Sequence, residues 1–215
     1  MNELPKIVLS IVPLLFAIVL HEVSHGWVAE KRGDPTARMM GRITLNPVSH
    51  IDPIGTILLP AVLLLTHSHF LFGWAKPVPV NFANLRGGRR DMALVALSGP
   101  LCNFVLAVLS AIVFHLTFSG TSGQGAVWGA VILPVHIMAG YSVVYNLILM
   151  VVNLFPIPPL DGGRIVVGLA PEQIAIPLAR FERYGMLILL LLIASGVWSY
   201  VVSPVILIFY RIFLM

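Results

Sequence analysis

The chain has 215 residues, of which 58% are hydrophobic and only 10% are charged, and its mean hydropathy is +0.95. Soluble domains carry about 25% charged residues, so this composition excludes a soluble globular protein and indicates an all-α polytopic membrane protein. The net charge of +4 is small, and we attribute it to loops that set membrane orientation rather than to a nucleic-acid surface. The single cysteine, Cys102, excludes an internal disulfide and a zinc site built from several cysteines.

Five apolar blocks follow one another along the chain, at residues 5–28, 51–74, 92–118, 126–155 and 184–215. Each is long enough to cross a bilayer as a helix. The last block could be one tilted helix or two pieces broken near Gly196 and Pro204. Between the first two blocks, residues 42–45 are predicted as a short strand, which could form part of a β-hairpin. Residues 156–183 are predicted to be a loop with a short helical piece.

The basic residues predict the topology. Apart from Lys6 and Arg211, they fall in three loops, at residues 31–42, 76–90 and 164–183, whereas the turn at 119–125 has none. The positive-inside rule places the three basic loops in the cytoplasm and the 119–125 turn outside. Segment 51–74 must then enter and leave on one side, as a re-entrant or broken helix, which Pro60 permits. A full crossing there would put one basic loop outside.

The first span carries His21, Glu22 and His25 in an H-E-x-x-H pattern. Residues four apart share one face of a helix, so both histidines can bind one metal ion. Glu22 lies about 100° further round the helix, beside the metal rather than bound to it. Two imidazoles and an adjacent carboxylate suit a zinc ion that activates water, with the glutamate accepting the proton. The alternative is a buried polar turn, which would be costly in an apolar span.

A catalytic zinc site needs a third protein ligand, and two carboxylates compete for this role. Asp161 follows a run of prolines that stops the preceding helix, and precedes two glycines that let backbone pack closely beside a metal. The predicted topology returns Asp161 to the side of the membrane where the histidines lie. Asp52 could also come near, although its neighbours do not suggest a site. Both carboxylates remain candidates at this point.

Three motifs occur in order along the chain: H-E-x-x-H at 21–25, Gly99-Pro100 followed by Asn103, and Asn153 leading to Leu160-Asp161-Gly162. This set resembles the site-2 protease family of intramembrane zinc metalloproteases. The resemblance implies a three-helix catalytic core, one Zn²⁺ bound by His21, His25 and Asp161, and Glu22 as general base. It also implies regulated intramembrane proteolysis, with cleavage in or beside a transmembrane helix of a membrane-protein substrate. Because there is no room for a PDZ or CBS domain, we expect one membrane-embedded peptidase domain over residues 1–215.

Two asparagines in apolar spans, Asn103 and Asn153, are candidates for binding substrate or stabilising the oxyanion, since a polar side chain there is costly without a partner. The alternative is that they only bond between helices. We expect Arg164, and the histidines His67 and His69, to lie at the membrane interface. The 42–45 strand could pair with an unwound substrate by strand addition.

Two other functions use the same residues. A metal transporter would need ligands along a path through the membrane, whereas these ligands cluster near one face. An inactive homologue that only binds membrane partners has no need for the intact Glu22. From the charge pattern we expect a multi-pass protein of the cell (inner) membrane, with its active site toward the cytoplasm. The sequence does not predict an oligomeric state.

Overall fold

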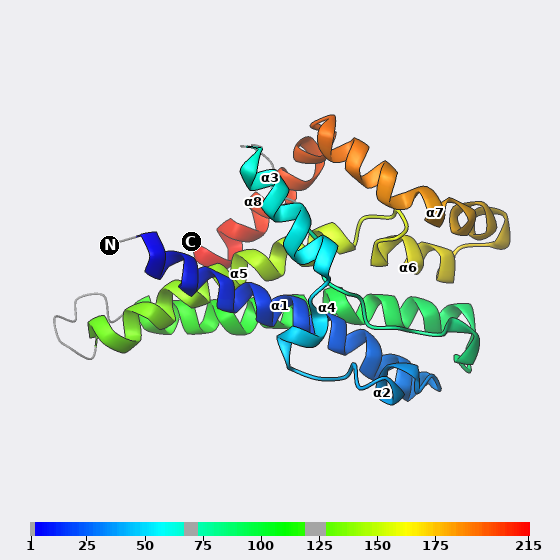
Figure 1. Cartoon of the computed structure of the whole chain (residues 1–215), viewed down its shortest axis with the longest axis horizontal. Coiled ribbons are helices and arrows are strands. Elements are labelled where there is room, and N and C mark those ends of the chain that lie inside the picture. The colour runs from blue at the N-terminus through cyan, green and yellow to red at the C-terminus, as the bar shows by residue number, and fades with distance from the viewer. Residues whose placement is uncertain (1–2, 67–72, 119–127) are drawn as a thin grey trace.

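A computed structural model describes residues 3–66, 73–118 and 128–215, and most of this polypeptide is helical (Figure 1). The elements in chain order are α1 (Glu3–Arg32), α2 (Thr36–Met39), η1 (Pro47–His50), η2 (Pro53–Leu58), α3 (Leu59–Leu65), η3 (Phe82–Asn84), α4 (Arg89–Phe118), η4 (Trp128–Ile132), α5 (Leu133–Asn153), α6 (Asp161–Leu169), α7 (Glu172–Ala194) and α8 (Val197–Leu214). The predicted 119–125 turn and the interfacial His67 and His69 lie outside the described residues.

Within the described residues, three stretches are long and apolar enough to cross a membrane: Val8–Arg32, Arg89–Phe118 and Trp128–Asn153. They correspond to α1, to α4 and to η4 with α5, and they match the predicted spans 5–28, 92–118 and 126–155. These helices run along the long axis of the molecule (Figure 1). The prediction of an all-α polytopic membrane protein is therefore confirmed.

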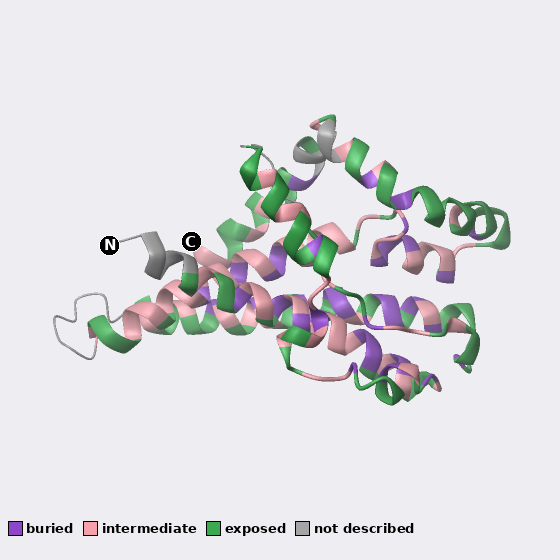
Figure 2. Cartoon of the chain, viewed as in Figure 1, coloured by how far each residue is buried: buried purple, intermediate pink, exposed green. Residues whose placement is uncertain are grey.

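The three long helices pack against one another through small and branched side chains. One buried cluster joins α4 and α5 and consists of Ala107, Ala111, Val143, Leu147 and Met150. Figure 2 shows that buried residues gather where α1, α4 and α5 run side by side, whereas α7 is mostly exposed. Alanines at such a contact let two helix backbones approach closely, which is how helices associate where lipid provides no hydrophobic driving force.

The end of α1 lies beside the start of α4. The N–H of Arg86 donates to the carbonyl of Arg32 over 3.0 Å, and the Arg32 guanidinium lies 3.5 Å from the Asp91 carboxylate. The two helices therefore run antiparallel, with the first two basic loops at the same end of the molecule.

The second apolar block leaves this bundle and comes back to it. Asp52 caps η2 by accepting hydrogen bonds from the N–H groups of Ile54 and Gly55, and α3 continues from η2 to Leu65. The N–H of Trp74 then donates to the carbonyl of Gly55 over 3.1 Å. Because both ends of the block lie together, segment 51–74 has the arrangement that a re-entrant segment requires.

The prediction of a short strand at residues 42–45 is wrong, and no strand occurs in the described ranges. The backbone here makes local turns: the N–H of Arg42 donates to the carbonyl of Ala37 over 2.8 Å, and the N–H of Asn46 donates to the Thr44 hydroxyl over 3.2 Å. These two N–H groups are therefore used in local turns and not in a β-ladder.

The C-terminal block consists of two helices. Gly196, with φ +76°, breaks it between α7 and α8, whereas Pro204 lies inside α8. A positive φ suits glycine because a Cβ would be strained there. The predicted loop at 156–183 is too long, because α6 occupies Asp161–Leu169 and α7 begins at Glu172.

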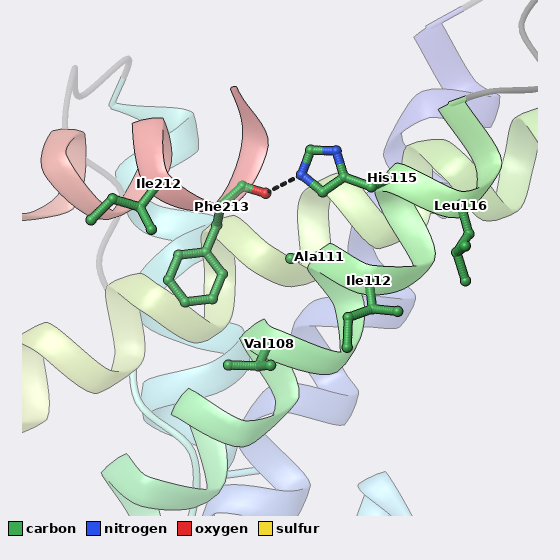
Figure 3. Close-up of a pocket in the computed structure, with 7 residues that line it drawn as sticks. All are labelled: Val108, Ala111, Ile112, His115, Leu116, Ile212 and Phe213. Atoms are coloured by element: carbon green, nitrogen blue, oxygen red, sulfur yellow. Dashed lines mark hydrogen bonds between the residues drawn. The ribbon is translucent and has the colours of Figure 1, made fainter.

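An apolar pocket of about 450 Å³ lies where α4 meets the end of α8 (Figure 3). Its lining includes Ala111, Ile112 and Phe213, and its one polar side chain, His115, donates from Nε2 to the carbonyl of Phe213 over 2.9 Å. That bond ties α8 to the core. The pocket has no group of ligands or nucleophiles, so the chemistry must be sought elsewhere.

Candidate metal centre

Helix α1 brings its two histidines to one point. The Nε2 atoms of His21 and His25 are 3.1 Å apart, and the two rings meet edge to face with their centroids separated by 4.7 Å. Both side chains are buried. The i, i+4 spacing therefore brings the two side chains together as predicted, and their Nε2 atoms point toward the same position.

Asp161, the first residue of α6, completes this group. Its Oδ2 atom lies 3.2 Å from His21 Nε2 and 3.3 Å from His25 Nε2. Within the described parts of the chain, these residues form the one group of three or more His, Cys, Asp or Glu side chains placed to hold a metal. Asp52, the competing candidate, instead uses its carboxylate to cap η2.

Glycines place Asp161 so close to α1. A Cβ at Gly162 would collide with the backbone of Leu154 and Phe155, and one at Gly163 would collide with the backbone of Ile157 and Pro158. The loop that follows α5 is therefore folded tightly against the start of α6. On its other side, a Cβ at Gly185 of α7 would meet the carbonyl of Pro158. The loop at residues 154–160, which leads to Asp161, is thus held between α6 and α7.

The three ligand atoms fit a zinc ion. Tetrahedral ligands at zinc distances are separated by about 3.3–3.4 Å from one another, close to the 3.1–3.3 Å observed. Asp161 Oδ2 is buried and has no hydrogen-bond donor, which is costly unless a cation satisfies it. Both observations indicate a site built for a metal.

The remaining ring nitrogens of the two histidines are already occupied. His21 Nδ1 lies 2.5 Å from Asn103 Oδ1, and His25 Nδ1 lies 2.7 Å from the carbonyl of Val95. Since these partners accept hydrogen bonds, each Nδ1 carries the proton and each Nε2 presents its lone pair. Outer partners of this kind fix the tautomer that a metal requires.

Gly99 of α4 packs directly against the two imidazole rings. A Cβ at this position would lie 2.5 Å from His21 Cε1 and 2.5 Å from His25 Nε2, closer than atoms can approach. Any side chain here would therefore displace the ligands. This contact gives a physical reason for the Gly99-Pro100 motif noted in the sequence.

Glu22 is next to the ligands but outside their group, as predicted. Its Oε2 atom accepts a hydrogen bond from the N–H of Val78 over 2.7 Å. Glu22, the two histidines and Asp161 share a cavity of about 230 Å³, which is also lined by side chains from α4, α5, α6 and α7. A carboxylate beside a metal position in a cavity is the arrangement needed to move a proton to and from water.

The two candidate asparagines have different positions. Asn103 is fully buried behind His21 and does not line the cavity, so its position does not support direct contact with substrate. Its amide group donates to Asn146 Oδ1 over 2.7 Å and to the carbonyl of Ala17 over 3.2 Å. Asn153, at the end of α5, does line the cavity, and its Nδ2 donates to the carbonyl of Leu149.

Sequence reasoning missed two residues near the site. Asn146 extends the polar chain from Asn103 by donating to the carbonyl of Ser142 over 2.8 Å. An asparagine inside an apolar span was the available signal. Arg164, expected at the interface, lines the cavity, donates to Glu182 over 2.9 Å and lies over the Phe82 ring.

The sequence model of peptidase family M50 matches residues 9–195. The chain is 35% identical over 194 residues to "Putative zinc metalloprotease YwhC" of Bacillus subtilis, which covers 90% of this chain and 84% of the relative. It is 29% identical over 193 residues to "Putative zinc metalloprotease Rip2" of Mycolicibacterium smegmatis, which covers 87% of this chain and 67% of the relative. The Rip2 protein of Mycobacterium tuberculosis (strain H37Rv) is also 29% identical, over 200 residues, with 90% and 70% covered. No solved structure matches the chain.

Proposed function

This chain belongs to peptidase family M50 and is a membrane-bound zinc metalloprotease, and we propose that it cleaves a peptide bond in or beside a transmembrane helix of a membrane-protein substrate. The depth of the site carries this proposal. His21 and His25 lie eight and four residues before Ala29, after which α1 ends in three charged residues. These separations correspond to about 12 and 6 Å along a helix. A site inside a span is suited to a substrate that already lies in the membrane.

We propose that His21, His25 and Asp161 hold one zinc ion. When bound, zinc polarises the scissile carbonyl and lowers the pKa of water to about 7. Glu22 accepts the proton of the attacking water and delivers it to the leaving amine. Asn103 keeps the His21 ring in its orientation, and Asn153, which lines the cavity, holds the substrate backbone.

We propose that the site opens toward the cytoplasm of a cell (inner) membrane. The support is the basic charge near the joined ends of α1 and α4, at Arg32, Arg86, Arg89 and Arg90, since basic loops stay on the cytoplasmic side. A cysteine replacing Arg90, in a Cys102→Ser background, should react with an impermeant reagent only from the cytoplasmic side. Reaction from the outside would contradict this orientation.

The family resemblance further supports a role in regulated intramembrane proteolysis, with a membrane protein and the bilayer as partners. We also propose that residues 1–215 act as one peptidase domain. It fits the position of Gly185 of α7 against the loop before Asp161.

The test is zinc content together with cleavage of a model transmembrane substrate in liposomes. Glu22→Gln should keep its zinc and lose cleavage, because the amide cannot accept the proton. Glu30→Gln, two turns further along α1 and paired with Arg38, is the matched control and should cleave normally.

Three results would count against the proposal. Loss of zinc in Glu22→Gln would mean that this residue supports the metal rather than moving a proton. Cleavage by Glu22→Gln at the wild-type rate would exclude Glu22 as the base. A wild-type enzyme that cuts only soluble peptides would contradict the membrane substrate.

A further inference from the structure

An extended segment covers the HExxH turn of α1. We call residues 74–80 the strap; they connect the 51–74 block to η3 and contain no helix or strand. Trp74, Ala75, Pro77, Val78 and Val80 all line the catalytic cavity. The strap is therefore part of the wall of the site, although none of its residues that line the cavity is an acid, a base or a metal ligand.

Side chains and backbone from the preceding loop hold the strap in place. The Arg42 guanidinium, itself buried, donates to the carbonyls of Lys76 and Pro77 over 3.0 and 3.3 Å. The N–H of Lys76 donates to the carbonyl of His50 over 2.9 Å, and the Thr56 hydroxyl donates to the carbonyl of Trp74 over 2.8 Å. These bonds fix the backbone on the N-terminal side of Val78.

The strap rests closely on α1 because of a glycine. A Cβ at Gly26, directly after the second metal-binding histidine, would lie 2.9 Å from Val78 Cγ1 and 3.0 Å from Ala37 Cβ. Val78 is buried in this contact. The strap backbone and the HExxH turn are thus in a fixed relation at this point.

One backbone donor in this part of the strap reaches the catalytic carboxylate. Pro77 and Pro79 have no N–H, so Val78 has the one backbone N–H of residues 77–79. That group donates to Glu22 Oε2 over 2.7 Å. Hydrogen bonds to a carboxylate are short and about twice as strong as neutral ones, and this bond holds one oxygen of the Glu22 carboxylate.

We propose that the N–H of Val78 is a positioning group for Glu22, and that Arg42 supports it by holding the two carbonyls before it. The strap then acts on the reaction by restricting the orientation of the base, not by contact with the scissile bond. This inference rests on the proposed function, since it assigns a role to the partner of the proposed base.

The experiment removes one N–H group. Val78→Pro lacks the donor, and Val78→Ala is the reference, because it loses the side-chain packing but keeps the N–H. A misplacement of about 1 Å at a catalytic group can cost about 100-fold in rate. We therefore expect kcat for the transmembrane substrate to be about 10–100-fold lower in Val78→Pro than in Val78→Ala. KM and zinc content should be the same in both.

A second variant covers the case in which proline disturbs the fold. Replacing Val78 with its α-hydroxy acid converts the amide to an ester, which removes the N–H and keeps the side chain. It should lower kcat as Val78→Pro does. Arg42→Gln should also lower kcat, and Arg42→Lys, which keeps one cationic donor, should restore part of it.

The outcomes separate this inference from the proposed function. If wild type cleaves, Glu22→Gln does not, and the ester variant has the kcat of the wild type, then the proposed function stands and the positioning role is wrong. Loss of zinc in the ester variant would also overturn it, because the strap would then support the metal site. If wild type does not cleave any membrane substrate, the proposed function itself fails.

Discussion

The cavity has two walls that are built in opposite ways. The wall that carries the metal ligands, hereafter the metal wall, consists of regular helices: α1 provides two histidines, α6 provides Asp161, and α4 provides the bare backbone at Gly99. The other wall is the strap, which has no regular structure. In the metal wall the backbone satisfies its own hydrogen bonds and side chains do the chemistry. In the strap, side chains such as Arg42 and Thr56 satisfy the backbone.

Irregular backbone is tolerated in a membrane protein where it lines a cavity. The strap lines the catalytic cavity, with Val78 buried and Lys76 and Pro77 exposed. The polar side chains around it therefore have a structural task first. A backbone N–H that is not used for secondary structure becomes available for another partner, and in the strap that partner is Glu22.

The largest effect is expected on zinc binding, from the substitution Asp161→Asn in the metal wall. Loss of an outer partner alone weakens metal binding about 10–100-fold, so loss of a charged ligand should weaken zinc binding by more than about 100-fold. Zinc affinity measured by competition with a chelator checks this. Asp52→Asn is the control, because asparagine caps a helix as well as aspartate does. If only the control loses zinc, the ligand assignment is reversed.

A smaller effect on zinc binding is expected from Asn103, which contacts the ligand His21 and not the metal position. Asn103→Ala removes the acceptor for His21 Nδ1 and should weaken zinc binding about 10–100-fold. Asn153→Ala is the matched comparison: it should retain zinc and lower cleavage, because Asn153 lines the cavity and its amide donates to the carbonyl of Leu149. Equal zinc affinity in the two variants would show that the hydrogen bond between Asn103 and His21 does not support zinc binding.

The smallest effect is expected where the strap is attached. Thr56→Val removes the hydroxyl that donates to the carbonyl of Trp74 and accepts from the N–H of Asp52. At about 1 kcal/mol for each bond, it should cost about 2 kcal/mol of stability, or about 4–8 °C in thermal midpoint. Thr66→Val is the control, because the Thr66 hydroxyl bonds only within its own helix. A loss of more than about 15 °C in Thr56→Val would mean that the attachment of the strap depends on this one side chain.

The metal wall was largely predictable because helical periodicity converts sequence spacing into geometry. The i, i+4 spacing alone places His21 and His25 on one face, and the turn residues around Asp161 marked it as the better candidate than Asp52. The predicted spans correspond to α1, α4 and α5 because long apolar runs have few other solutions in lipid.

What depends on contacts between distant segments was not predictable. A polar residue in a span, such as Asn103, signals a buried partner, but not whether that partner is a substrate or a histidine of another helix. The strap is held by hydrogen bonds from Arg42 to residues more than thirty positions away, and no periodicity in the sequence indicates such bonds.

The start of α7 was missed because its first turns are amphipathic, so apolar content alone placed the boundary near residue 184 instead of Glu172.

The close contact of Gly185 with the carbonyl of Pro158 bears on attempts to reduce this enzyme to a minimal fragment. The three long helices and α6 contain all the proposed ligands and the base, so a designer could end the chain after Leu169. Such a fragment would lack the surface against which the proline loop before Asp161 is packed. The smallest active fragment should therefore extend at least through Gly185, even though nothing in α7 binds the metal.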